Sequence, residues 1–116
     1  MSKTDKINKL AEKGKSDKLV PLVDNKKPEI HLTAIAALGE IGDDTALNTL
    51  VALLRDPNPD KRAEAVKALA KVALRDPRNS AAKTHLQHLK NNEKDEKVKE
   101  ALDEAFNLIS QNHQSA

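Results

Sequence analysis

Several residue types that build common functional sites are missing or rare in this chain. Cysteine is absent, which excludes disulfides, thiolate metal sites, iron–sulfur clusters and a cysteine nucleophile. Tryptophan and tyrosine are absent and Phe106 is the single phenylalanine, so stacking of nucleic-acid bases has little support. No apolar run approaches the ~20 residues of a membrane-spanning helix, and the opening MSKTDKINKL lacks a signal-peptide core. We therefore expect a cytoplasmic protein that does not bind membranes.

The residues that are present favour helices. Ala and Leu are abundant, whereas the three Gly and five Pro stand mostly between helical stretches. No stretch alternates apolar and polar residues as a half-buried strand does. The 116 residues suffice for one domain, 1–116. The pattern predicts helices at residues 3–13, 17–25, 29–41, 44–55, 60–75, 79–90 and 95–111.

Gly and Pro residues predict where these helices end. Gly14 and Gly42 are expected to adopt the positive φ that terminates a helix. Pro21 falls inside the second predicted helix, where it either sets a late start or bends the helix. The expected N-caps of later helices are Asp43 or Asp44, Asn58 and Asn79.

An internal repeat is the strongest signal in the sequence. Residues 19–41 align with residues 50–72 at an offset of 31 without gaps, and 7 of the 23 aligned positions are identical. The matches include Pro28 with Pro59 in the turns. A fixed period with matched prolines and small residues predicts stacked helical hairpins. The clearest repeats are 17–41 and 44–75.

Two helices differ in how much of their surface is apolar. Helix 29–41 is apolar around most of its circumference, which predicts packing on more than one side. Helix 95–111 has one apolar face within an arc of about 160°, which predicts a terminal capping helix. The apolar positions of this second helix are Val98, Ala101, Leu102, Ala105, Phe106, Leu108 and Ile109.

Residues 33–72 resemble the HEAT repeat, and most of all the bacterial HEAT-like class named after phycobilisome lyases. The resemblance rests on A-x-x-A-L-G-x-I-G-D at residues 34–43, A-L-x-x-L-x-x-L-L-x-D at 46–56, and R-x-x-A-x-x-A-L at 62–69. It implies an all-α solenoid of stacked antiparallel helical hairpins, about seven helices in total. It also implies structural roles for Asp43, Asp56 and Arg62, because Arg–Asp pairing in such repeats ties one hairpin to the next.

No group of residues nominates a catalytic or cofactor-binding site. His85 and His88 form H-x-x-H on a predicted helix, but a metal needs three or four donors, and we expect one half-buried and one exposed histidine. The adjacent Asp43 and Asp44 are more typical of a helix cap than of acid–base chemistry. We expect no cofactor, no metal and no enzyme. Some HEAT-like proteins are enzymes, including bilin lyases and alkylated-base glycosylases, so a bilin lyase relative is the minor alternative.

Positive charge is concentrated in two parts of the chain. Residues 1–27 carry a net +4 and residues 61–90 a net +6, whereas residues 28–60 carry −5 and residues 91–116 carry −3. The second basic block offers an alternative function, binding of nucleic acid or another polyanion. A solvated helix face is the competing interpretation. The basic residues concerned are Lys61, Lys67, Lys71, Arg75 and Arg78.

The leading hypothesis is a non-enzymatic protein–protein interaction or scaffold module. In HEAT-like stacks the second helix of each hairpin is taken to line the concave groove, which the resemblance places at 17–25, 44–55 and 79–90. The groove would be polar and mildly basic, and would suit a protein partner of acidic character. The chain itself is expected to be a monomer or a weak dimer. The expected partner-binding residues are Lys18, Asn48, Arg55, Lys83, Gln87 and Lys90.

Overall fold

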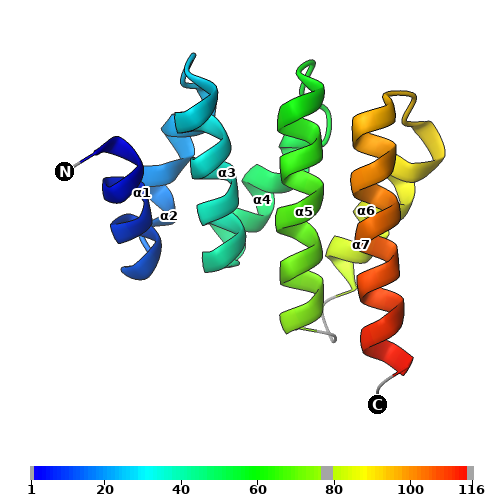
Figure 1. The fold of residues 1–116 in the computed structure, drawn as a ribbon. Helices are drawn as coiled ribbons and strands as arrows, with labels where there is room; N and C mark the ends of the chain where they lie inside the picture. Colours follow the sequence, from blue (N-terminus) through cyan, green and yellow to red (C-terminus); the bar gives the residue numbers. More distant parts are fainter. Residues whose placement is uncertain (1, 77–79, 115–116) are drawn as a thin grey trace.

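The computed structural model describes residues 2–76 and 80–114, and throughout these ranges the regular structure is helical. Figure 1 shows the helices standing side by side from the N-terminus at one end to the C-terminus at the other. The all-α prediction is confirmed. The helices are α1 (Lys3–Glu12), α2 (Ser16–Leu19), the 3₁₀ helix η1 (Val20–Asp24), α3 (Pro28–Ile41), α4 (Asp44–Leu53), α5 (Pro59–Arg75), α6 (Ala81–Asn92) and α7 (Glu96–Gln114).

The predicted helix ends are mostly confirmed by local geometry. Gly14 and Gly42 adopt φ values of 68° and 64°, a conformation that costs glycine little. The side chain of Asp43 accepts a hydrogen bond from the backbone N–H of Ala46 and so caps α4. Asn58 likewise begins α5, while the predicted cap Asn79 lies outside the described residues. These residues therefore stop each helix where the chain must turn.

Pro21 changes the second helix instead of delaying it. The α-helical part of this element ends at Leu19 after four residues, and the chain continues as the 3₁₀ helix η1, with Pro21 in its first turn. Proline lacks the N–H that an α-helical bond needs, so a tighter turn takes over. The second element of the first hairpin therefore consists of a short α-helix followed directly by a 3₁₀ helix.

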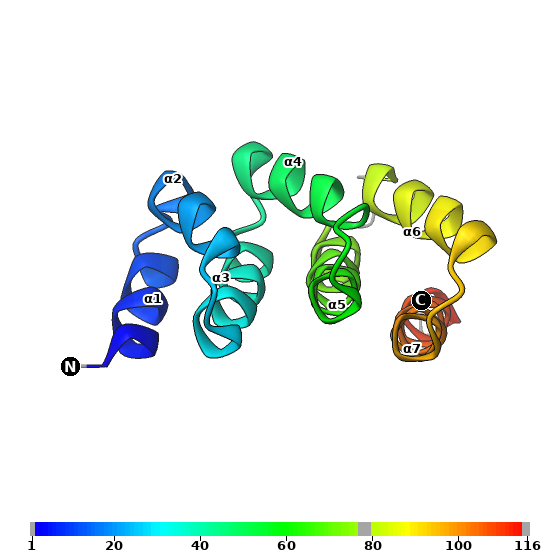
Figure 2. The same ribbon diagram turned by 90° about the horizontal axis from the view of Figure 1, so that it is seen from above.

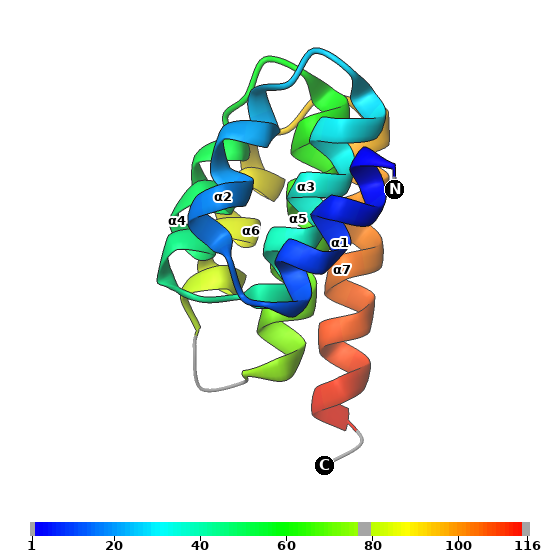
Figure 3. The ribbon, with the colours of Figure 1, turned by 90° about the vertical axis from the view of Figure 1, so that its left-hand side faces the viewer.

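The helices form two layers that bend into a shallow curve. We call α1, α3, α5 and α7 the inner layer, and α2, η1, α4 and α6 the outer layer. Seen from above, the outer layer bows outward at α4 and the inner layer lies on the inside of the bend (Figure 2). Viewed from the N-terminal end, the two layers lie side by side (Figure 3). The molecule measures 41 × 31 × 20 Å along its principal axes.

Small residues explain why the inner layer is the closely packed one. Helix α3 packs along α5, and α5 along α7, whereas α4 touches α2 and α6 only slightly. A Cβ added at Gly39 would lie only 2.7 Å from the Cβ of Ala68, so the backbones of α3 and α5 approach very closely there. The helices that approach most closely must lie on the inside of the bend.

The core runs between the two layers along the whole stack. Helix α3 buries residues on several sides, among them Ile30, Ala34, Ile35 and Leu38, as expected for a helix in the middle of a stack. Helix α7 buries one face, as expected for a terminal helix, but Leu108 departs from that prediction because it is 50% exposed.

Candidate functional site

The histidine pair on α6 lies at the surface. His85 and His88 are both exposed, so the expectation that one of them is half-buried is wrong. Within the described ranges, no cluster of three or more His, Asp or Glu side chains has the arrangement needed to hold a metal ion. The described residues therefore give no support for a metal site on α6.

Arg62 ties the start of α5 to the turn between α6 and α7. Its Nη1 donates to the backbone carbonyl of Asp56 at 2.8 Å, while its Nε and Nη2 donate to the two carboxylate oxygens of Glu93 at 2.9 and 3.1 Å. Arg62 thus reaches the acidic turn at residues 56–60, as the sequence indicates, but its ion pair is with Glu93 and not with an aspartate. The Glu93 side chain is 5% exposed and the Arg62 side chain 18%. Such a shielded bidentate pair holds its geometry well.

Hydrogen bonding keeps Glu93 ionised. Burial alone would raise the pKa of Glu93, but the hydrogen bonds from Arg62 and from the backbone N–H groups of Asp95 and Lys94 outweigh it. The pKa of Glu93 therefore lies below its ordinary value. The same contact raises the pKa of Arg62. Both groups are charged at neutral pH and serve the fold.

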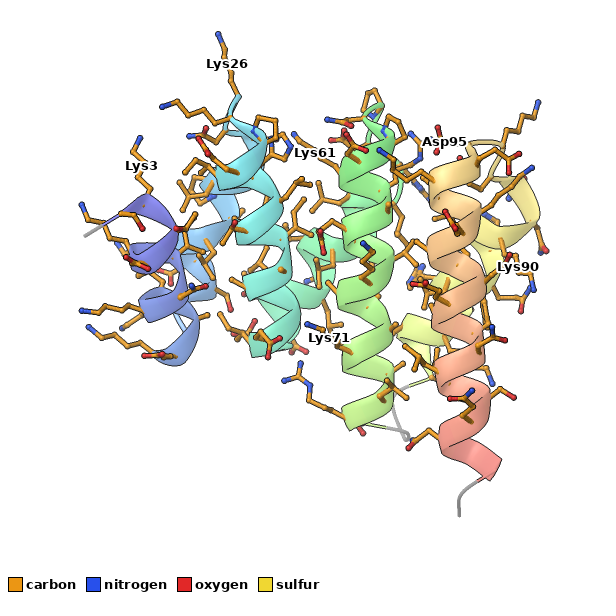
Figure 4. All side chains as sticks on the ribbon, in the orientation of Figure 1. Lys3, Lys26, Lys61, Lys71, Lys90 and Asp95 are labelled. Carbon is orange, nitrogen blue, oxygen red and sulfur yellow. The ribbon has the colours of Figure 1, made fainter. Side chains whose placement is uncertain are left out.

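Two of the five cations in the predicted basic stripe bind helix α3. Lys71 forms an ion pair with Glu40 at 3.0 Å (Figure 4), and Arg75 donates to the backbone carbonyls of Gly39 and Glu40 at the end of α3. A guanidinium there satisfies carbonyls that have no partner within the helix. Of the remaining three, Lys67 is exposed, Lys61 is half-buried, and Arg78 lies outside the described residues.

The residues predicted to line a concave groove lie on the other side of the molecule. They belong to α2, α4 with its following turn, and α6, which form the outer layer on the outside of the bend (Figure 2). Their placement in a concave groove is therefore wrong, because the inner layer consists of the first helix of each hairpin and α7. Partner binding by these residues stays a prediction. All six are exposed: Lys18, Asn48, Arg55, Lys83, Gln87 and Lys90.

The outer layer is hollowed between η1 and α4. This open hollow has a volume of about 450 Å³, and Asn48 is the one predicted groove residue that lines it. Farther along the layer, the Lys90 ammonium lies 5.0 Å from the centre of the Phe106 ring, a cation–π contact that joins α6 to α7. The basic residues of the outer layer thus do not form one continuous patch.

The inner layer carries a furrow between α5 and α7 that the sequence did not predict. Two hollows of about 350 and 200 Å³ share Lys67, Ala101 and Glu104 and so join end to end. We call the joined hollow the inner furrow. Its lining comprises Leu32, Asp60, Ala63, Glu64, Lys67, Ala70, Lys71, Lys97, Glu100, Ala101, Glu104, Ala105 and Leu108.

The inner furrow combines an apolar floor with an acidic rim. Two of its three lysines are engaged, because Lys97 pairs with Asp60 at 2.7 Å and Lys71 pairs outside the furrow. Within the described residues, the rim carboxylates Glu64, Glu100 and Glu104 form no ion pair. Alanine side chains make the floor, and half-exposed Leu108 stands at one end. The rim therefore presents unneutralised negative charge beside apolar surface.

Comparison with known proteins gives one result. A family model for HEAT repeats matches residues 16–107. The search of curated proteins and the search of solved structures found no match. Across residues 2–76 and 80–114, no helix combines the length and the apolar character needed to cross a bilayer.

Proposed function

Because this chain belongs to the HEAT-repeat family, we propose that it is a non-enzymatic protein-interaction module that displays side chains on a stiff helical stack. HEAT repeats generally act as scaffolds for protein interactions. The described histidines and carboxylates form no cluster that could hold a metal ion, and the shielded ion pair Arg62–Glu93 has a structural explanation.

The inner furrow is the surface that supports this proposal best. Its shape, acidic rim and apolar floor suit a segment that carries Lys or Arg side chains beside one or two apolar ones. Half-exposed Leu108 is the single observation that carries the choice, since it is the one large apolar side chain of the described residues that is well exposed. Because the rim of the furrow is acidic, the partner we propose is basic, whereas the sequence suggests an acidic partner.

Two alternatives use the cations instead. The first is an acidic partner bound to the outer layer through Arg55, Lys83 and neighbouring residues. The second is a polyanion bound to the stripe on α5, where Lys67 remains the exposed lysine without an ion pair in the described structure. Lys71 and Arg75 already bind α3, which weakens this second alternative.

The test is capture of partners from the source organism's lysate on the tagged protein, with and without nuclease, read by mass spectrometry. Substitution of Leu108→Ser together with Glu104→Lys should abolish capture of a nuclease-resistant protein. The matched outer-layer variant Arg55→Ala with Lys83→Glu should leave capture unchanged. If only the outer-layer variant abolished capture, the site would lie on the outer layer. If nuclease treatment removed all captured proteins, polyanion binding would be favoured.

The finer resemblance to the phycobilisome-lyase class of HEAT-like proteins stays a prediction. The family match covers HEAT repeats as a whole, and it does not separate bacterial subclasses. Incubation of the purified protein with a free bilin and a bilin-accepting protein would test the minor enzymatic alternative. Covalent attachment of the bilin would overturn the non-enzymatic assignment.

A further inference from the structure

A second apolar pocket lies at the N-terminal end of the stack, away from the inner furrow. It has a volume of about 270 Å³ and is formed where α1, η1 and the first turn of α3 meet. Ile7 and Ile30 are almost fully buried at its base, and Leu10 and Leu22 are half-buried at its sides. We call it the N-terminal pocket. Its remaining lining residues are Lys3, Lys6 and Asn25.

The short first hairpin explains why this pocket is open. Helix α1 has 10 residues, whereas α3 has 14, so α1 cannot cover α3 over its full length. In the end-on view, the η1–α3 junction rises above the start of α1 (Figure 3). Apolar side chains that pack against a neighbouring helix elsewhere in the stack are therefore only partly covered here.

The rim of the N-terminal pocket is positively charged. Lys3 and Lys6 line it from α1, and among the described residues no carboxylate lines it. Lys26 belongs to the turn that follows Asn25, and its side chain leaves the molecule at the same edge as Lys3 (Figure 4). Asp5 and Glu29 are near in the chain, but neither lines the pocket. This rim is thus opposite in charge to the inner furrow.

Asn25 adds a polar group at the same rim. Its side-chain oxygen accepts a hydrogen bond from the backbone N–H of Lys27 at 2.9 Å, and its backbone carbonyl bonds His31 Nδ1 at 2.8 Å. These contacts hold the residue in place and leave its side-chain NH₂ group to donate to an incoming acceptor. A carboxylate or a peptide carbonyl of a bound segment would serve as that acceptor.

We infer that the N-terminal pocket binds an acidic amphipathic segment of a partner protein. Two apolar side chains about one helical turn apart would enter the pocket, and flanking Asp or Glu side chains would meet Lys3 and Lys6. The apolar base and the lysine rim suit side chains of a protein segment as the occupants. The inference does not depend on the inner furrow, and the chain would join two partners of opposite charge.

The test uses a fluorescein-labelled synthetic peptide of about 15 residues, rich in Glu, with leucines three and four positions apart. Fluorescence anisotropy with the full chain should show saturable binding that weakens as salt rises, because exposed charges are screened over a Debye length of about 10 Å. A peptide with serine in place of each leucine should not bind. Dissociation constants weaker than about 1 mM for the leucine peptide would overturn the inference.

A pair of double variants locates the site. Lys3→Gln with Lys6→Gln should weaken binding about tenfold, whereas Lys9→Gln with Lys13→Gln removes the same charge from the far end of α1 and its C-cap and should change it less than twofold. Equal effects of both variants would mean non-specific attraction and refute the site. Circular dichroism of each variant checks that the fold is retained.

Other occupants give distinguishable outcomes, each of which overturns the inference. Sedimentation of a dimer that Lys3→Gln with Lys6→Gln abolishes, without peptide binding, would identify a second copy of the chain. Binding to phosphatidylserine vesicles but not to the peptide would identify a membrane surface. The furrow variant Leu108→Ser should leave peptide binding unchanged, so failure of this inference and failure of the furrow proposal are separable.

Discussion

The ion pair between Arg62 and Glu93 should stabilise the stack far more than its exposed counterpart between Lys71 and Glu40. Both pairs join residues that are 31 positions apart, with N···O distances of 2.9 and 3.0 Å. The side chains of the second pair, however, are more than half exposed. The two pairs therefore differ in burial and in the number of hydrogen bonds, and the exposed, singly bonded pair serves as the weak reference.

The expected loss of stability follows from the contacts that each substitution removes. Arg62→Met removes two bonds to a carboxylate that is 5% exposed and the bonds to the backbone carbonyls of Asp56 and Pro57. Breaking a fully buried pair costs about 3–5 kcal/mol, and partial exposure of Arg62 lowers the expectation to about 2–4 kcal/mol. Lys71→Met should cost about 0–1 kcal/mol, as exposed pairs do.

Urea denaturation followed by far-ultraviolet circular dichroism is the assay. The chain contains no Trp and no Tyr, so it lacks useful intrinsic fluorescence. A cycle with Glu93→Leu and the double variant should give a coupling energy of about 1–3 kcal/mol. A loss below about 0.5 kcal/mol for Arg62→Met, or additive single effects, would refute the reasoning.

The same pair predicts a pH dependence. The pKa of Glu93 is lower in the folded protein than its ordinary value of 4.5, so the folded state favours the ionised form. Its contribution is therefore fully present above pH 4.5 and is lost as the pH falls through the folded pKa. The stability difference between the wild type and Glu93→Gln should shrink over that acidic range. A constant difference would show that the charge of Glu93 is unimportant.

Three further substitutions test other contacts. Gly39→Ala should destabilise by about 1–3 kcal/mol in a thermal melt, although alanine normally favours a helix, because its Cβ would clash with Ala68; an increase in melting temperature would contradict the close approach. Asp43→Ala should cost about 1–2 kcal/mol through loss of the α4 cap, whereas Asp44→Ala should cost much less. Arg75→Met should lower the free energy of unfolding in urea by about 1 kcal/mol, because carbonyls at the end of α3 lose their donor. An unchanged free energy of unfolding would mean that water replaces the Arg75 guanidinium as the donor.

Local signals predicted most of the fold. Gly42 followed by Asp43 ends one helix and begins the next, and Pro59 after Asn58 starts α5 where the sequence indicates. These signals act through backbone geometry within a few residues, which is why they can be recognised without the tertiary structure. The repeat at offset 31 then indicated how the helices stack.

The parts that were not predicted depend on distant neighbours. Glu93 lies 31 residues from Arg62, and nothing in its local sequence distinguishes it from other surface glutamates. Leu108 shares the apolar arc of its helix, yet half of it stays exposed, and a helical wheel contains no information on neighbouring helices. The inner furrow follows from the same lack of cover.

The side on which the stack curves had a signal in the sequence that the prediction did not use. Small residues such as Gly39 and Ala68 occur on α3 and α5, and helices bearing them approach most closely. That spacing places these helices on the inside of the bend. Assigning the groove from the order of the helices alone gave the opposite side.

The unequal spacing of the two layers has a mechanical consequence. Closely packed inner helices resist sliding and separation, because any movement there must break contacts such as that between Gly39 and Ala68. The outer helices touch so little that their separation changes at small cost. The stack should therefore bend about an axis that lies in the inner layer, while the outer helices move apart or together. A partner that wedges between α4 and α6 would tighten the curve and narrow the furrow on the opposite face.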